Sequence, residues 1–141
     1  MRTERAHSHY TAVQLFDLVA DVERYPEFLP WVLSSRIVRR HEQTVWVEMA
    51  MGNRLLSRIF SSVGTLDRPR RIDISSRDPM FERFQQTWTF EPASGGGTAV
   101  EYRVDFKLRS ALLQALIGGS LADRAPAMMQ AFKHRARRLY G

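Results

Sequence analysis

Two alternating segments joined by a glycine-rich turn constrain the fold of this chain more than any other feature of its sequence. In residues 99–108 every second side chain is apolar, and residues 84–91 alternate in a similar way, with Gln86 as a polar residue on the apolar face. This period of two is typical of antiparallel strands with one buried face and one wet face. The Ser-Gly-Gly-Gly run at residues 94–97 favours a hairpin turn between them. A phosphate-binding loop is not expected here, because such a loop leads into a helix.

Shorter patterns predict further strands before this hairpin. In residues 44–51 the apolar side chains again recur at every second position, and turn-forming residues separate this segment from its neighbours. The predicted strands cover residues 34–40, 44–51, 55–66 and 71–76, and an edge strand near the N-terminus carries His7 and His9.

Helices are predicted on both sides of this block of strands. Thr11 is a favourable N-cap for a short amphipathic helix, and Asp21 is a candidate N-cap for a second, very short helix that ends at Pro26. After Ser110, apolar residues recur at every third or fourth position, which predicts one long helix of about eight turns. We expect Pro126 to kink this helix, because proline removes a hydrogen bond and collides with the preceding turn.

The order of these elements predicts an α+β fold. A strand, two small helices, about six strands and one long helix favour a curved antiparallel sheet of about six to seven strands with its helices on one face. A long helix across the concave face can leave a gap, which is a natural place for an apolar ligand. The 141 residues suit one domain, and we expect it to span residues 1–141.

The composition excludes several kinds of site. The chain has no cysteine, which excludes disulfides, a thiolate nucleophile and Cys-ligated zinc or iron–sulfur sites. The 21 Lys and Arg residues exceed the 15 Asp and Glu residues and give a net charge of +6. This excess suits an anionic partner, but solubility explains it equally well. Without a secretory signal or a run of ~18 apolar residues, we expect a cytoplasmic protein that at most lies on the surface of the inner membrane.

The seven residues 25–31, which read Tyr-Pro-Glu-Phe-Leu-Pro-Trp, are unusual. Two prolines stiffen the backbone around large apolar side chains, which then form either a plug on the core or the lip of an apolar pocket. The segment closely resembles the signature of the coenzyme Q-binding protein family and its bacterial relatives, which include the ribosome-association toxin. These families belong to the START-like, helix-grip superfamily of polyketide cyclases and lipid-transfer proteins. Weaker matches follow in the same order along nearly the whole chain, such as residues 88–91 and 131–136.

Three positions depart from the family pattern. Val32 stands where the family often has a cysteine, and residues 78–81 read Asp-Pro-Met-Phe where a Gly-Pro-Phe turn is usual. Pro126 lies in a helix that usually lacks proline. The last two departures bear on the mouth of the pocket and on the helix that covers it.

The resemblance implies a non-enzymatic protein that binds ubiquinone (coenzyme Q) or a similar prenyl lipid in an apolar cavity. Such a protein would support respiratory electron transport or quinone biosynthesis and would need no catalytic cofactor. Burial of an isoprenoid tail would contribute roughly 25 cal/mol per Å² of apolar area. Each candidate residue taken singly is better explained as ordinary core, so the prediction concerns the set. The candidates come from the stiff segment, the sheet and the long helix: Phe28, Leu29, Pro30, Trp31, Phe60, Phe81, Trp88, Tyr102, Val104, Leu116, Leu121, Met128 and Met129.

Two alternative functions remain open. In a ribosome-association factor, the arginine clusters within residues 36–40 and 68–71 would face ribosomal RNA, although an anionic phospholipid surface would suit them equally. In a cyclase or another enzyme acting on an apolar substrate, Gln86, Glu48 or Arg58 would line the cavity, but no acid–base pair or nucleophile motif marks them. We expect no metal site, because His7 and His9 lack a third ligand at a familiar spacing, and no binding to DNA.

Overall fold

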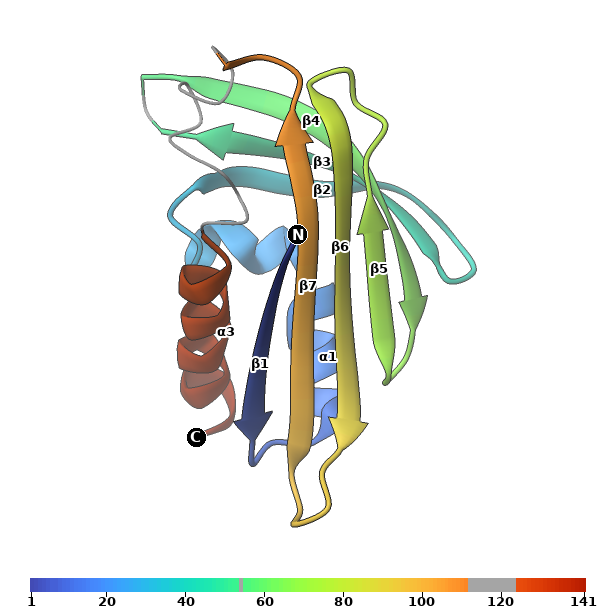
Figure 1. Ribbon diagram of the computed structural model, residues 1–141, viewed down its shortest axis with the longest axis vertical. Helices are drawn as coiled ribbons and strands as arrows, with labels where there is room; N and C mark the ends of the chain where they lie inside the picture. Colours follow the sequence, from blue (N-terminus) through green and yellow to red (C-terminus); the bar gives the residue numbers. More distant parts are fainter. Residues whose placement is uncertain (54, 112–123) are drawn as a thin grey trace.

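One curved antiparallel sheet forms the framework of the molecule, and the helices lie against its concave side (Figure 1). The computed structural model describes residues 1–53, 55–111 and 124–141. Within these residues seven strands are ordered β1-β7-β6-β5-β4-β3-β2 across the sheet. The strands are β1 (Arg2–Ser8), β2 (Val32–His41), β3 (Thr44–Gly52), β4 (Ser57–Asp67), β5 (Arg71–Ser75), β6 (Phe81–Pro92) and β7 (Thr98–Leu108). The helices among the described residues are α1 (Ala12–Ala20), the 3₁₀ helix η1 (Val22–Glu27) and α3 (Ala125–Tyr140). The predicted α+β, helix-grip arrangement is confirmed.

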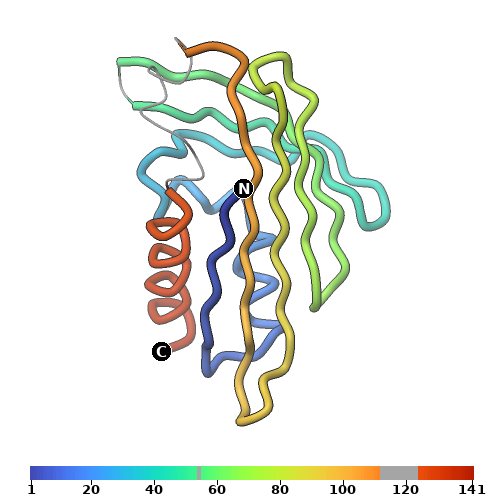
Figure 2. Tube along the Cα trace, viewed as in Figure 1, coloured from blue at the N-terminus to red at the C-terminus, as the bar shows by residue number. Residues whose placement is uncertain are grey.

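The strands from β2 to β7 are antiparallel neighbours in chain order, and β1 joins the sheet beside β7. The chain therefore leaves β1 at one edge of the sheet and reaches β2 at the opposite edge. Figure 2 shows that α1 and η1 make this crossing on the concave side. This topology places both small helices between the sheet edges, where they close the interior.

The hairpin predicted from the alternating segments is confirmed. β6 pairs with β7 from Phe81 and Leu108 down to Pro92 and Thr98, and Gly96 and Gly97 in the turn have φ angles of 96° and 74°. The strand predicted at residues 55–66 instead begins at Ser57. The side-chain oxygen of Asn53 accepts hydrogen bonds from the N–H groups of Leu55 and Leu56, which form a turn before the strand.

The predicted first helix is confirmed with its cap. The Thr11 side chain accepts a hydrogen bond from the Gln14 N–H, and the Gln14 side chain accepts one from the Thr11 N–H. Such a reciprocal capping box satisfies two N–H groups that the helix leaves free. The predicted second short helix is confirmed as η1, and Asp21 occupies its N-cap position. The Asp21 side chain makes no capping hydrogen bond, however, and η1 ends at Glu27 rather than at Pro26.

The prediction that Pro126 kinks a long helix is wrong for the helix as described. α3 begins at Ala125, so Pro126 lies in its first turn, where the N–H that proline lacks would have no partner within the helix. The predicted helical residues 112–123, with the candidate site residues Leu116 and Leu121, lie outside the described residues.

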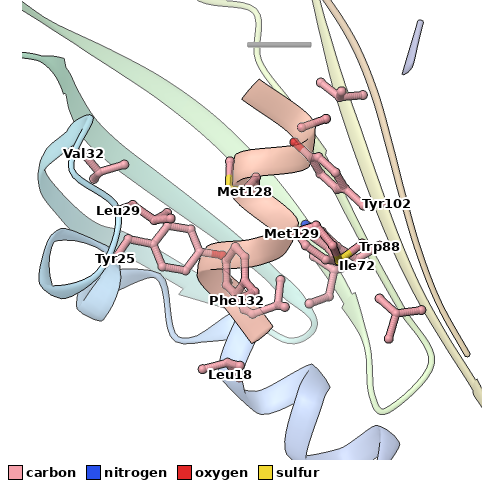
Figure 3. Close-up of a cluster of buried hydrophobic side chains, with 14 of the residues drawn as sticks. Leu18, Tyr25, Leu29, Val32, Ile72, Trp88, Tyr102, Met128, Met129 and Phe132 are labelled. Atoms are coloured by element: carbon pink, nitrogen blue, oxygen red, sulfur yellow. Dashed lines mark hydrogen bonds between the residues drawn. The ribbon is translucent and has the colours of Figure 1, made fainter. Parts of the chain in front are cut away.

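The core lies between the concave face of the sheet and the described helices α1, η1 and α3. Figure 3 shows Met129 and Phe132 of α3 beside Trp88 of the sheet, and Met128 on the side of the helix that faces Leu29. The predicted inward faces are confirmed, since Phe84, Gln86, Trp88 and Phe90 of β6 are all buried. None of the described helices is long and apolar enough to cross a membrane.

Candidate ligand-binding site

The stiff segment at residues 25–31 folds over the start of β2 and is tied to the core at both ends. The Tyr25 hydroxyl donates a hydrogen bond to the Val19 carbonyl. The Leu29 N–H donates to the Tyr25 carbonyl at 2.9 Å, and the Gly52 N–H donates to the Trp31 carbonyl at 3.1 Å. These bonds direct Leu29 inward, where it is 1% exposed. The segment is therefore a wall of the interior.

Behind this wall lies an apolar hollow, which we call the main cavity, with a volume of about 70 Å³. Its lining comes from strands β3 to β6, from η1 and the start of β2, and from Met128 of α3. The volume is well below the ~300–1,000 Å³ of small-molecule sites. A ligand therefore needs lining side chains to move, and Met49, Met51 and Met128 supply flexible ones.

Two buried polar side chains line the main cavity. Ser62 on β4 is 7% exposed and Gln86 on β6 is 8% exposed. Neither side chain forms a hydrogen bond within the described part of the chain. The sheet register places Gln86 beside Ile74 and Ile74 beside Gly64, two residues along β4 from Ser62. A serine hydroxyl and a glutamine amide can each donate to a ligand oxygen, so this face offers two donors in an otherwise apolar site.

The titratable side chain among the described lining residues of the main cavity is Tyr25. Burial raises the pKa of Tyr25, and the charge of Asp21 raises it further. The phenol therefore stays protonated at neutral pH. The described lining offers no acid and base that exchange a proton in that range, as general acid–base catalysis requires.

Three packed rings separate the main cavity from a second hollow. We call Tyr25, Trp88 and Phe132 the aromatic wall: the ring centroid of Phe132 lies 5.1 Å from that of Trp88 and 5.5 Å from that of Tyr25. Along β6, Gln86 lines the main cavity and Phe90 lines the second hollow.

The second hollow, which we call the side pocket, has a volume of about 340 Å³. It lies between β1, α1, the β6–β7 part of the sheet and α3. Val19 is the lining residue that the two hollows share among the described residues. Among the described residues, the interior thus offers two separate spaces.

The predicted site residues divide between these spaces and the core. Leu29, Trp31, Phe60 and Met128 line the main cavity. Trp88 and Met129 line the side pocket.

The remaining described candidates line neither space. Phe81, Tyr102 and Val104 are core residues, and Pro30 is exposed. Phe28 packs on Phe132 with a centroid separation of 5.2 Å.

Sequence reasoning left out several residues that line the main cavity. Val45, Val47 and Met51 on β3 belong to the alternating face that the sequence marks as inward, so the same signal could have included them. Ser62 had no such signal, because serine is common on exposed strand faces. Of the polar residues considered for an enzyme, Gln86 lines the cavity, whereas Glu48 pairs with Arg36 on the surface and Arg58 is exposed.

The two predicted arginine clusters differ in how much charge they leave free. Arg68 donates two hydrogen bonds of 2.8 Å to the Asp17 carboxylate and lowers the pKa of Asp17. Arg71 contacts Asp73 at 2.7 Å. In the other cluster Arg39 stacks on the Trp46 ring at 4.6 Å. Neither Arg39 nor Arg40 has a carboxylate partner in the described part of the chain.

The described residues hold no group of three or more metal-binding side chains. His7 instead makes a 2.9 Å hydrogen bond to the Gly96 carbonyl. This contact gives the histidine a structural role at the end of β1.

Most of the chain matches a known protein family. The model of the family "Polyketide cyclase / dehydrase and lipid transport" matches residues 8–133. The chain belongs to this family. Among its curated relatives, the ribosome association toxin RatA of Rickettsia prowazekii is 34% identical over 91% of this chain and 90% of its own length. The mitochondrial coenzyme Q-binding protein COQ10 of Dictyostelium discoideum is 24% identical over 94% of this chain and 66% of its own length.

Solved structures confirm the helix-grip fold of this polyketide cyclase and lipid transport family member. TTHA0849 from Thermus thermophilus covers 99% of both chains with a TM-score of 0.81 and 18% identity. The Zhui aromatase/cyclase from Streptomyces covers 96% of this chain and 84% of its own with a TM-score of 0.67 and 19% identity. At these identities the likeness shows the shared fold, and the family itself contains both enzymes and binding proteins.

Proposed function

We propose that this chain is a non-enzymatic binding protein that holds an apolar small molecule, ubiquinone or another prenyl lipid, in the main cavity. One observation carries this proposal. Ser62 and Gln86 offer two donors that have no partner among the described residues, and the rest of the lining is apolar. A prenyl quinone has the matching chemistry, since carbonyl oxygens sit at one end of a long apolar tail.

The energetics of the site favour such a ligand. A ligand oxygen that accepts a hydrogen bond from Ser62 or Gln86 would add about 0.5–1.5 kcal/mol per bond to the free energy of binding. Burial of the tail then adds roughly 25 cal/mol per Å² of apolar area. The small volume of the empty cavity means that binding must displace side chains, and the three methionines adapt at low cost.

A binding role fits the site better than catalysis does. Tyr25, with its raised pKa, is the titratable group among the described lining residues, and the polar pair is neutral. Glu48 and Arg58, the charged residues that an enzyme would use, lie outside the cavity lining.

The proposal is tested by extracting lipids from the purified protein for mass spectrometry and by titrating ubiquinone into the stripped protein. We expect a co-purified quinone and saturable binding. Val47→Phe fills the main cavity and should reduce binding at least tenfold, whereas the matched change Val38→Phe alters an exposed position and should leave binding intact. Recovery of no quinone together with no binding of added ubiquinone would refute the proposal.

A second candidate, association with a ribosomal subunit, is favoured by the curated relatives named for ribosome association, which are more similar to this chain than COQ10 is. The surface of the protein supplies cations for RNA phosphates. Arg39 and Arg40 protrude at the end of β2 without carboxylate partners in the described part of the chain, whereas Arg68 and Arg71 are already neutralised.

Co-sedimentation with purified ribosomal subunits tests this candidate. Binding should fall steeply as salt rises, because contacts to phosphates release counterions. Arg39→Ala/Arg40→Ala should weaken pelleting and reduce the salt slope more than the matched Arg68→Ala/Arg71→Ala. Failure of the wild-type protein to pellet at low salt counts against ribosome association and leaves the lipid-binding proposal unaffected.

A further inference from the structure

The side pocket combines an apolar floor with a cationic rim, and this combination points to a ligand different from the one proposed for the main cavity. We propose that the side pocket binds an amphipathic carboxylate, with the alkyl chain on the floor and the carboxylate at Lys133 and Arg137. The inference rests on the side pocket alone and does not depend on the function proposed for the main cavity.

The floor is built from large buried side chains on three elements. Trp88 and Phe90 on β6 are 3% and 1% exposed, and Phe132 and Met129 face them from α3. Leu18 closes the floor from α1. Because the volume of about 340 Å³ lies at the lower end of the range for small-molecule sites, one alkyl chain is a suitable occupant.

The rim is cationic. Lys133 and Arg137 lie four residues apart on α3, so they occupy the same side of the helix. Both are exposed, both line the side pocket, and neither has a carboxylate partner in the described part of the chain. His7 and His9 complete the rim from the end of β1, and no acidic side chain is found among its described lining residues.

The helix dipole favours a cation at Arg137, which lies in the last turn of α3, but it contributes little at Lys133, which lies earlier in the helix. It does not account for their position above an apolar floor. Arg138 is the useful contrast, because it carries the same charge in the same turn but is not a lining residue of the side pocket. A cation that serves the dipole alone would give no preference for a carboxylate over a neutral ligand of equal length.

The three tryptophans of the chain report on three different places, which makes the proposal testable. Trp88 lines the side pocket, Trp31 lines the main cavity, and Trp46 lies beneath Arg39 on the surface. Trp31→Phe/Trp46→Phe keeps Trp88 as the single reporter, and Trp46→Phe/Trp88→Phe keeps Trp31.

The probe is a long-chain fatty carboxylate with bromine atoms on its chain, used below its micelle-forming concentration. Bromine quenches a tryptophan that it contacts, so the Trp88 protein should be quenched saturably and the Trp31 protein should be quenched less. The brominated alcohol of the same length should bind at least tenfold more weakly to the Trp88 protein, because it lacks the charge that the rim recognises.

Three variants of the Trp88 protein distinguish recognition of the carboxylate by the rim from a nonspecific effect of positive charge. Lys133→Ala and Arg137→Ala should each weaken the carboxylate about fivefold, as expected for the loss of one partly exposed charge contact, and Arg138→Ala should have no effect. The thermal melting of each variant confirms that it is folded. Equal affinity for the carboxylate and the alcohol, or an equal loss in all three variants, would overturn the proposal. Quenching of Trp31 in preference to Trp88 would also overturn it, since the carboxylate would then occupy the main cavity.

Discussion

The Phe132 ring of α3 packs edge-to-face against Trp88 of β6, with centroids 5.1 Å apart and planes inclined at 68°. This contact is the point at which the interior divides, since Met128 faces the main cavity and Met129 faces the side pocket. Phe132 also packs against Tyr25 and Phe28 of the stiff segment. One side chain on the helix therefore joins the sheet to the segment that carries the family signature.

Removal of the Phe132 ring should destabilise the folded protein. Phe132→Ala removes a buried ring and leaves a cavity, so we expect a loss of about 3–5 kcal/mol in the free energy of unfolding, measured by urea denaturation. Phe28→Ala is the matched control. Phe28 is half-buried on the other side of Phe132, so its loss should be clearly smaller. An equal loss of free energy of unfolding in the two variants would show that Phe132 contributes no more to the stability of the core than Phe28 does.

The two buried tyrosines should respond in opposite directions to removal of the hydroxyl. The Tyr102 hydroxyl is buried and has no hydrogen-bond partner among the described residues, whereas the Tyr25 hydroxyl donates to the Val19 carbonyl. Tyr102→Phe should raise the free energy of unfolding by about 1 kcal/mol, and Tyr25→Phe should lower it by about 1 kcal/mol. Urea denaturation of both variants checks this. A loss in Tyr102→Phe as large as that in Tyr25→Phe would mean that the Tyr102 hydroxyl has a partner in solution.

The sheet and its inward face could be predicted from the sequence because alternation reports directly which face of a strand is buried. The hairpin around Gly96 and Gly97 and the capping box at Thr11 could likewise be predicted from local residues. The position of Pro126 could not, because an apolar stripe with helical spacing does not reveal where a helix begins.

The division of the interior into two spaces could not be predicted at all. Trp88 and Phe60 are both expected to be inward-facing apolar residues, yet one lines the side pocket and the other lines the main cavity. The difference depends on Phe132, which approaches Trp88 from a helix 44 residues later in the chain. Contacts between residues so far apart follow from packing rather than from local pattern.

The glycines of the β6–β7 turn should differ sharply in their tolerance of a side chain. A Cβ atom at Gly97 would lie 2.3 Å from the Ser8 carbonyl oxygen, and its φ of 74° is itself unfavourable for other residues. Gly97→Ala should therefore lower the melting temperature strongly and loosen the end of β1, while Gly95→Ala, which meets no atom within 4 Å, should be nearly neutral. Thermal denaturation followed by circular dichroism measures both. Similar melting temperatures for the two variants would contradict the close approach of β1 to the turn.

The ion pair between Asp17 and Arg68 should make stability depend on pH at the acidic end. Hydrogen bonds from Arg68 lower the pKa of Asp17 in the folded protein, so the unfolded chain binds this proton more readily. The stabilisation is therefore complete above the pKa of an unfolded aspartate, about 3.9, and is lost as the pH falls through the lower folded value. Melting temperatures of the wild type and Asp17→Asn should differ at pH 7 and converge toward pH 2. The difference should be modest because both side chains are about half exposed.

Glu91→Gln is the control for the Asp17→Asn variant. Glu91 lies 4.0 Å from Arg70 in an exposed pair, so this substitution should change the melting temperature little. A difference between wild type and Asp17→Asn that persists undiminished at low pH would show that the carboxylate acts through packing rather than through its charge.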